Sequence, residues 1–304
     1  MFYWLFYETL FPHFSPFRLF GYVTLRTALA SLTALLLCVV LGPWLIAKLR
    51  QLQIGQHIRE DGPQSHQQKA GTPTMGGVLI IISVVVPTLL FANLRNMQIW
   101  LALFGLLSFA LIGFHDDFTK VRKARNLGLT ARAKFALQVL AALLLGCLLA
   151  GMHFRGLYST AMNVPFFKDF RPELLIDSFL DNPYTYPLAF VFFFIFLVLV
   201  VVGSANAVNL TDGLDGLAIG LNIIAAGAMT VLVYLSGHAE FASYLDLARV
   251  PGTHELTIFC GALTGASLGF LWYNGHPAQV FMGDVGSLAL GGALGTVAVL
   301  IKQE

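Results

Sequence analysis

Apolar residues fill eight long runs of this 304-residue chain, and the polar residues gather between them. None of the runs contains Asp, Glu, Lys or Arg, and each approaches the roughly 20 residues that a helix needs to cross a membrane. Backbone groups in lipid must bond within their own segment, so we expect helices. The pattern predicts an all-α polytopic membrane helix bundle with eight transmembrane helices, forming one integral membrane domain over residues 1–304. The eight runs are Thr27–Ala47, Gly76–Leu94, Met97–His115, Phe135–His153, Tyr184–Gly203, Gly216–Gly237, Leu256–Tyr273 and Val285–Ile301.

The composition agrees with a membrane protein. Hydrophobic residues make up 57% of the chain and charged residues only 11%, and the mean hydropathy is +0.75. A soluble domain has about 25% charged residues. The net charge of +2 is too small to favour a nucleic-acid partner. Membrane lipid is therefore the first partner that we expect.

The basic residues predict how the helices are oriented. Ten of the 18 lysines and arginines lie in the connections Lys48–Lys69 and Lys120–Lys134, which the positive-inside rule places in the cytoplasm. Charged groups at the membrane surface, rather than in mid-span, favour an enzyme that joins a soluble substrate to a lipid over a pump or transporter. Alternation of eight spans then brings four polar segments to the same face, namely Lys69–Gly77, Asp116–Lys134, Asn206–Asp215 and Asn274–Asp284.

Two adjacent carboxylates, Asp116 and Asp117, directly follow the third predicted span. If the helix continues, Lys120 lies three or four residues away, within pairing distance of both. Paired aspartates bind Mg²⁺ through oxygen, or act as a base when one pKa is raised. A salt bridge at a helix end is the alternative interpretation.

The segment NLTDGLDG places Asn209, Asp212 and Asp215 at intervals of three. On a helical turn these side chains would share one face, and Gly213 and Gly216 would let a ligand approach the backbone. Two acids and an amide favour a binding site. A capped start of the sixth span is the alternative.

Three further positions are candidates for binding. Asp284 opens the last span, where it either caps the helix or, if it meets the other acids, binds a metal ion. Phe281 is either an interfacial aromatic or a stacking platform for a base. Lys69 precedes the glycine-rich segment Gly71–Gly77, whose N–H groups would hold a phosphate, and Lys134 either contacts a phosphate or snorkels to the interface.

Together, five strings in this order and spacing resemble the phospho-N-acetylmuramoyl-pentapeptide-transferase family of the polyprenyl-phosphate hexose-1-phosphate transferase superfamily. The short Asp-Asp and Asn-x-x-Asp patterns fit the whole superfamily, whereas GTPTMGG and PAQVFMGDVGSLALGG are typical of the muramoyl branch. The resemblance runs from about Phe11 to the last residue. The strings are GTPTMGG at Gly71–Gly77, FHDDFTK at Phe114–Lys120, NLGLTARAKFALQ at Asn126–Gln138, NAVNLTDGLDGLA at Asn206–Ala218 and FLWYNGHPAQVFMGDVGSLALGGALG at Phe270–Gly295.

The resemblance implies an enzyme of peptidoglycan synthesis. Its substrates would be UDP-N-acetylmuramoyl-pentapeptide and undecaprenyl phosphate, its products lipid I and UMP, and its cofactor Mg²⁺. It implies a multi-pass protein of the bacterial inner membrane with the active site on the cytoplasmic face. A homodimer stays open, and no nucleic acid is implied.

The same resemblance implies roles for single residues. Asp284 would bind Mg²⁺, Asp116 would be a candidate to deprotonate the lipid phosphate, and Asp117 would lie beside it as a third catalytic residue. Direct attack by the lipid phosphate and a covalent phospho-aspartate intermediate both fit these residues. The substrate-binding residues would be Lys69 and Lys134 on phosphates, Phe281 on uracil, and Asn209, Asp212, Asp215 and Asn274 around the nucleotide.

Family members continue with two further spans and a cytoplasmic loop that carries a His-His-His run, which the 304 residues do not contain. We therefore expect this form of the chain to be weakly active or inactive. Two other functions stay open. One is a related transferase that passes N-acetylglucosamine-1-phosphate to the same kind of lipid, and the other is a catalytically silent membrane scaffold.

Overall fold

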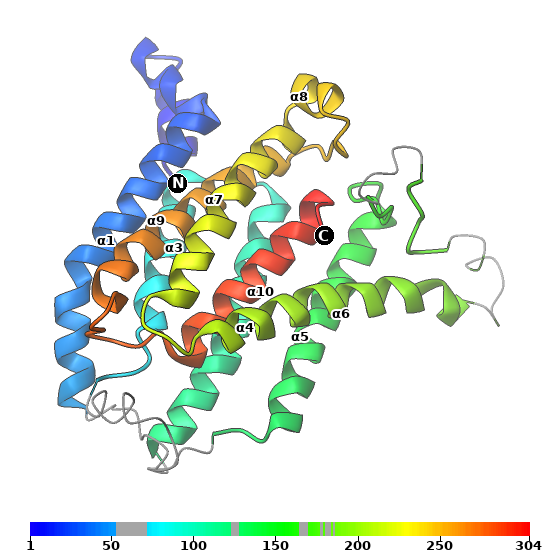
Figure 1. Ribbon diagram of the computed structural model, residues 1–304. Coiled ribbons are helices and arrows are strands. Elements are labelled where there is room, and N and C mark those ends of the chain that lie inside the picture. Colours follow the sequence, from blue (N-terminus) through cyan, green and yellow to red (C-terminus); the bar gives the residue numbers. More distant parts are fainter. Residues whose placement is uncertain (53–71, 123–127, 164–169, 177–178, 180–183, 185) are drawn as a thin grey trace.

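The computed structural model describes residues 1–52, 72–122, 128–163, 170–176, 179, 184 and 186–304 (Figure 1). Within them the chain is a bundle of long helices. Most of them run between the same two ends, while the helix over Tyr186–Thr211 crosses the bundle at a steep angle (Figure 1). The long helices are α1 (Val23–Gln51), α3 (Gly77–Phe91), α4 (Met97–Arg122), α5 (Ala131–His153), α6 (Tyr186–Thr211), α7 (Leu217–Gly237), α9 (Leu256–Asn274) and α10 (Gly283–Ile301). The shorter ones are η1 (Tyr3–Leu10), η2 (Ser15–Gly21), α8 (Ala239–Tyr244) and η4 (Thr253–Glu255).

Seven of these helices are long and apolar enough to cross a membrane, which confirms the predicted all-α polytopic class. The predicted number of eight is wrong by one. The run Gly76–Leu94 forms only α3, a helix of 15 residues. At a rise of 1.5 Å per residue α3 is about 22 Å long, which is shorter than the hydrocarbon core of about 30 Å.

Contacts at both ends of α3 explain its length. Before it, the chain pairs with the segment that leads into α10: Gly76 N–H donates to the carbonyl of Phe281 at 2.9 Å, and Phe281 N–H donates to the carbonyl of Pro73 at 2.8 Å. These bonds hold the start of α3 at Gly77, one residue after the predicted start. At the other end, Ala92 is extended, and Asn93 N–H donates to Glu255 at 2.9 Å.

The helix α10 forms the centre of the bundle, and 17 of its 19 residues are buried. It packs against α4, α6, α3 and α7, while α9 packs against α1 and α7. Small residues allow this burial because they let helix backbones approach closely. The stripe Gly291, Gly292, Ala293 and Gly295, which the sequence marks as suited to close packing, lies inside the chain against α6 and α4.

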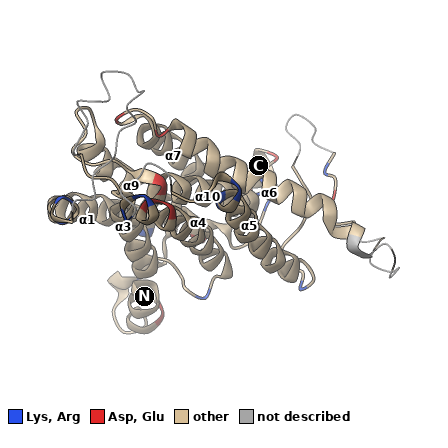
Figure 2. Cartoon of the chain, turned by 90° about the horizontal axis from the view of Figure 1, so that it is seen from below, with Lys and Arg blue, Asp and Glu red and all other residues tan. Residues whose placement is uncertain are grey.

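All four predicted polar segments meet at one end of the bundle, as far as their residues are described. This end lies at the bottom of Figure 1, and Figure 2 shows it from below, with acidic and basic residues close together near the middle. Both α4 and α5 continue beyond their apolar runs into this end. The common end is thus confirmed, while its cytoplasmic orientation stays a prediction.

A buried ion pair joins three helices at the opposite end of the bundle. Arg26 on α1 makes two hydrogen bonds with Glu255, at 2.8 and 2.7 Å, and a third with the carbonyl of Phe91 at 3.1 Å. The Tyr3 ring covers the guanidinium at 4.4 Å. These contacts tie α1, the end of α3 and the start of α9 together.

Candidate active site

The two adjacent aspartates lie on the last turns of α4, as the predicted helix requires. Asp116 and Asp117 are each 3% exposed, so bulk water does not solvate their charges. Lys120 supplies a counter-charge instead: its Nζ lies 2.6 Å from Asp116 Oδ2 and 3.3 Å from Asp117 Oδ1. The salt bridge suggested as an alternative is therefore present, but a third acid shares it.

This third acid is Asp284, in the first turn of α10. Its Oδ2 lies 2.7 Å from Lys120 Nζ and 2.8 Å from Lys134 Nζ, and its Oδ1 accepts a hydrogen bond of 2.8 Å from Asn209 Nδ2. The capping role suggested for Asp284 is wrong, because Met282 occupies the N-cap and its side chain makes no capping hydrogen bond. The Asp284 carboxylate points to other helices instead.

The start of α10 is held by an acid of α4. Val285 N–H donates to Asp117 Oδ2 at 3.1 Å, so that Asp117 provides the negative charge that a helix N-terminus favours. Gly283 allows this approach, with φ at +72° and an added Cβ only 2.6 Å from Asp117 Oδ2. Asp116 is fixed in turn by the N–H of Leu129, which donates to its Oδ1 at 2.7 Å.

Lys134 and Asn209 enter the site from α5 and α6. Thr130 caps α5 by accepting a hydrogen bond from Ala133 N–H at 3.2 Å, which starts the helix one turn before Lys134. Asn209 lies on the last turn of α6, and its Nδ2 also donates to Ser287 Oγ at 2.8 Å. The site is therefore assembled from four helices.

Asp212 lies just beyond α6, close to the same acids. Burial is the main cause that raises its pKa, to about 7, and the charges of Asp284 and Asp117 raise it further, while a hydrogen bond from the Gly283 backbone opposes the shift. A carboxylate in this position is ready to gain or lose a proton near neutral pH.

Asp215 and Asn274 organise the connection between α9 and α10 rather than the acid cluster. Asp215 Oδ2 lies 3.2 Å from His276 Nδ1 and accepts from Ala278 N–H at 3.3 Å. Asn274 accepts from Gly216 N–H at 3.1 Å and donates to the carbonyl of Val280 at 3.0 Å. Asn209, Asp212 and Asp215 therefore do not share one face, because the chain leaves the helix after Thr211.

Phe281 is half-buried beside this cluster, and its backbone pairs with the segment Pro73–Gly76. That pairing brings the glycine-rich segment to the acidic end of the bundle. Lys69 lies outside the described residues. The predicted roles of Lys69, Phe281 and Asn274 in substrate binding stay predictions.

The residues fit a divalent cation. Asp116, Asp117 and Asp284 each offer a carboxylate oxygen, and these oxygens lie within 4.8 Å of one another. Oxygen donors are the ligands that Mg²⁺ prefers. The positive charge between them in the structure is the Lys120 ammonium.

Sequence reasoning left Lys120 out of the candidate site, although it contacts all three carboxylates. The Asp-Asp-x-x-Lys spacing predicts that Lys120 pairs with the two aspartates within α4. It does not predict the contact between Lys120 and Asp284, which lies 164 residues away in the sequence.

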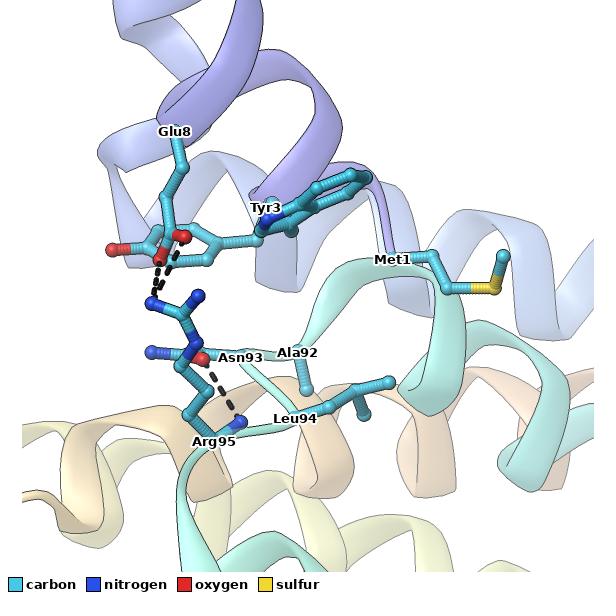
Figure 3. A pocket seen from close by; sticks show the side chains of 8 residues that line it. Met1, Tyr3, Glu8, Ala92, Asn93, Leu94 and Arg95 are labelled. Carbon is cyan, nitrogen blue, oxygen red and sulfur yellow. Dashed lines mark hydrogen bonds and ion pairs between the residues drawn. The ribbon is translucent and has the colours of Figure 1, made fainter.

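A pocket lies at the opposite end of the bundle, away from the acids (Figure 3). It has a volume of about 250 Å³ and is lined by Met1, Tyr3, Trp4, Glu8 and residues 92–95. Its two charged residues pair with each other, with 3.1 Å between Arg95 Nη1 and Glu8 Oε2. The convergent charges, rather than this pocket, mark the candidate active site.

Comparison with known proteins gives matches over the whole chain. The model of glycosyl transferase family 4 matches residues 99–302, and the phospho-N-acetylmuramoyl-pentapeptide-transferase signature 1 matches residues 69–81. A phospho-N-acetylmuramoyl-pentapeptide-transferase of Solibacter usitatus is 63% identical over 304 residues, which cover 100% of this chain and 80% of the relative. Those of Koribacter versatilis and Acidobacterium capsulatum are 58% and 61% identical, each over 100% of this chain and 81% of the relative.

Proposed function

Because the chain belongs to the phospho-N-acetylmuramoyl-pentapeptide-transferase family, we propose that it transfers phospho-N-acetylmuramoyl-pentapeptide from UDP-N-acetylmuramoyl-pentapeptide to undecaprenyl phosphate. The products would be lipid I and UMP. The chain is a multi-pass membrane protein and a phospho-sugar transferase. The single observation that best supports the reaction is the convergence of Asp116, Asp117 and Asp284 at one end of the bundle.

Phosphoryl transfer depends on positioning and on neutralising charge that spreads over phosphate oxygens. A Mg²⁺ ion held by Asp284, with Asp116 and Asp117 beside it, would supply most of that neutralisation. Lys134, 18% exposed, would add a positive charge next to the transferred phosphate. Lys120 would keep the remaining carboxylates charged without mutual repulsion.

The residues around the cluster suggest how the substrates are bound. Asp116 is the proposed base for the lipid phosphate, as the family resemblance implies. Its Oδ1 accepts from Leu129 N–H, so Oδ2, which now lies beside Lys120, would have to take the proton. Asp212 and Asn209 would line the nucleotide site, and Phe281 would stack on uracil. Asp215 and Asn274 would act by holding the loop that carries Phe281.

The location follows from the same proposal. A uridine nucleotide is made in the cytoplasm and a polyprenyl phosphate is held in the bilayer, so the acidic end would face the cytoplasm at the inner membrane. The basic residues of the two neighbouring connections favour this orientation.

The test is Mg²⁺-dependent UMP release by the 304-residue chain in lipid, with undecaprenyl phosphate present. Asp284→Ala should abolish release, whereas Glu240→Ala, which removes an exposed acid from the opposite end, should not. Release without Mg²⁺, or in the Asp284→Ala protein, would refute the proposed site. Faster release from UDP-N-acetylglucosamine would favour the related transferase. Nucleotide binding without release from either donor, also after a relative's C-terminal spans and His-rich loop are appended, would favour the silent scaffold.

A further inference from the structure

Gln138 on α5 and Asn206 on α6 form a reciprocal pair of side-chain amides. Asn206 Nδ2 donates to Gln138 Oε1 at 2.6 Å, and Gln138 Nε2 donates to Asn206 Oδ1 at 3.4 Å. Asn206 Nδ2 also donates to the carbonyl of Val202, one turn earlier on α6, at 2.8 Å. Gln138 is 1% exposed. A buried amide is destabilising when its partners are lost, so neither side chain can turn away freely.

Each member of this amide pair lies one helical turn from a residue that holds Asp284. Lys134 precedes Gln138 by four residues, and Asn209 follows Asn206 by three. Side chains at these spacings lie on the same face of a helix. Lys134 contacts Asp284 Oδ2 at 2.8 Å, and Asn209 contacts Oδ1, also at 2.8 Å. The two oxygens of one carboxylate are thus held from two helices, which the amide pair joins one turn away.

The helix α5 depends on such a contact for its position. It lies at the edge of the bundle (Figure 1), where it packs against α4 and α6. Its outer face exposes large apolar side chains, including Phe135, Leu140 and Leu144. Lipid on that face does not select one height or rotation of the helix, and packed apolar side chains tolerate small shifts better than paired amides do.

We propose that Gln138 and Asn206 are positioning residues, which set α5 against α6 and thereby hold Lys134 and Asn209 on the two oxygens of Asp284. The consequence for turnover rests on the proposed function. The consequence for the geometry does not, because it can be measured in protein that has neither metal nor substrate.

The geometric test measures how fast lysines react with acetic anhydride in metal-free protein, read by mass spectrometry. Gln138→Leu removes the amide and keeps a side chain of similar size. We expect Lys134 to react severalfold faster in this variant, while Lys120, which is carried by α4, keeps its rate. Asn222→Leu is the matched control, since Asn222 is 2% exposed and bonds to Ser267 at 2.8 Å between α7 and α9. It should leave Lys134 unchanged.

The kinetic test asks whether the amides act through position. A misplacement of about 1 Å can cost roughly 100-fold in rate, so we expect Gln138→Leu to lower kcat by about 10- to 100-fold with little change in KM for the nucleotide. Gln138→Asn shortens the pair and should also lower kcat. The exchanged variant, with Gln138→Asn and Asn206→Gln, keeps the combined length and should recover part of the loss.

Two results would overturn the proposal. One is an unchanged Lys134 reaction rate in folded Gln138→Leu or Gln138→Asn protein. The other is a loss of kcat that only follows a loss of thermal stability, without rescue in the exchanged variant. If Lys134 becomes reactive but the unmodified chain has no transferase activity, even with a relative's C-terminal spans and His-rich loop appended, the proposed function fails and the positioning role is supported.

Discussion

Replacing Lys120 with methionine should destabilise the metal-free protein and make its stability more responsive to Mg²⁺. The Lys120 ammonium lies within 3.3 Å of all three carboxylates. Without it, Asp116, Asp117 and Asp284 face one another with Lys134 as the nearby cation. A divalent cation bound between them would restore the missing charge.

The size of the effect follows from burial and distance. Opposite charges 4 Å apart attract by about 4 kcal/mol at an effective dielectric constant near 20, and removal of one partner from a buried pair costs about 3–5 kcal/mol. Lys120 is 33% exposed, so water screens part of this, and we expect a loss of about 2–3 kcal/mol. In a chain of this size the melting temperature should fall by roughly 3–5 °C.

The assay is thermal unfolding in detergent, first with EDTA and then with increasing Mg²⁺. Arg122→Met is the control, because it removes an exposed cation from the same end of α4. A cation at 100 times its Kd stabilises a protein by about 2.7 kcal/mol, enough to reverse most of the loss. The reasoning is wrong if Lys120→Met melts like the unmodified protein in EDTA, or if Mg²⁺ raises both melting temperatures equally.

Three further predictions follow from other contacts. The pKa of Asp212 is raised from its ordinary value of 3.8 to about 7 in the folded protein. Between these pH values the folded form holds a proton that the unfolded chain releases. The Asp212 carboxyl group therefore lowers the stability of the folded protein increasingly as the pH rises from about 4 to 7. Asp212→Asn should therefore raise the melting temperature most above pH 7, by an amount that shrinks toward pH 4; a pH-independent gain would contradict this. Gly283→Ala should abolish Mg²⁺-dependent activity, since its φ of +72° and the nearby Asp117 oxygen leave no room for a methyl group, and near-normal UMP release would disprove this. Arg26→Met should cost about 3–5 kcal/mol of stability because it leaves Glu255 buried without its partner; the double change with Glu255→Leu should melt higher than Arg26→Met alone, and equal melting would show that the charge of Glu255 is harmless.

The sequence predicts most of the fold because long apolar runs identify the segments that cross the membrane. It fails for Gly76–Leu94, because the helix ends at Phe91: Ala92 is extended, and Asn93 N–H donates to Glu255. This bond joins residues 162 positions apart in the chain, and hydropathy carries no information about it. Hydropathy also misses that α4 and α5 extend beyond their apolar runs. Those extensions contain Asp116 and Lys134, whose charges are compensated by residues of other helices.

The candidate site was predicted as a set of residue types but not as a geometry. The family resemblance selects Asp284 as a metal ligand, whereas local reasoning favours a helix cap. The structure excludes the cap, because the Asp284 oxygens contact Asn209 and Lys120, and the metal-ligand role stays a prediction. Asp215 belongs to the same motif as Asp212, yet it turns to His276 because the chain reverses at Gly216. Motif spacing identifies residues that are close in the sequence, whereas this site is formed by contacts between residues that are far apart in the sequence.

The central burial of α10 has a consequence for how the protein is made. Helices enter the membrane in chain order, so α4 arrives long before α10 and must carry Asp116 and Asp117 without Asp284 or Lys134. Lys120 is already one turn away on the same helix. The nascent chain therefore carries a counter-ion for these two acids, and the candidate site is complete only after α10 has been synthesised.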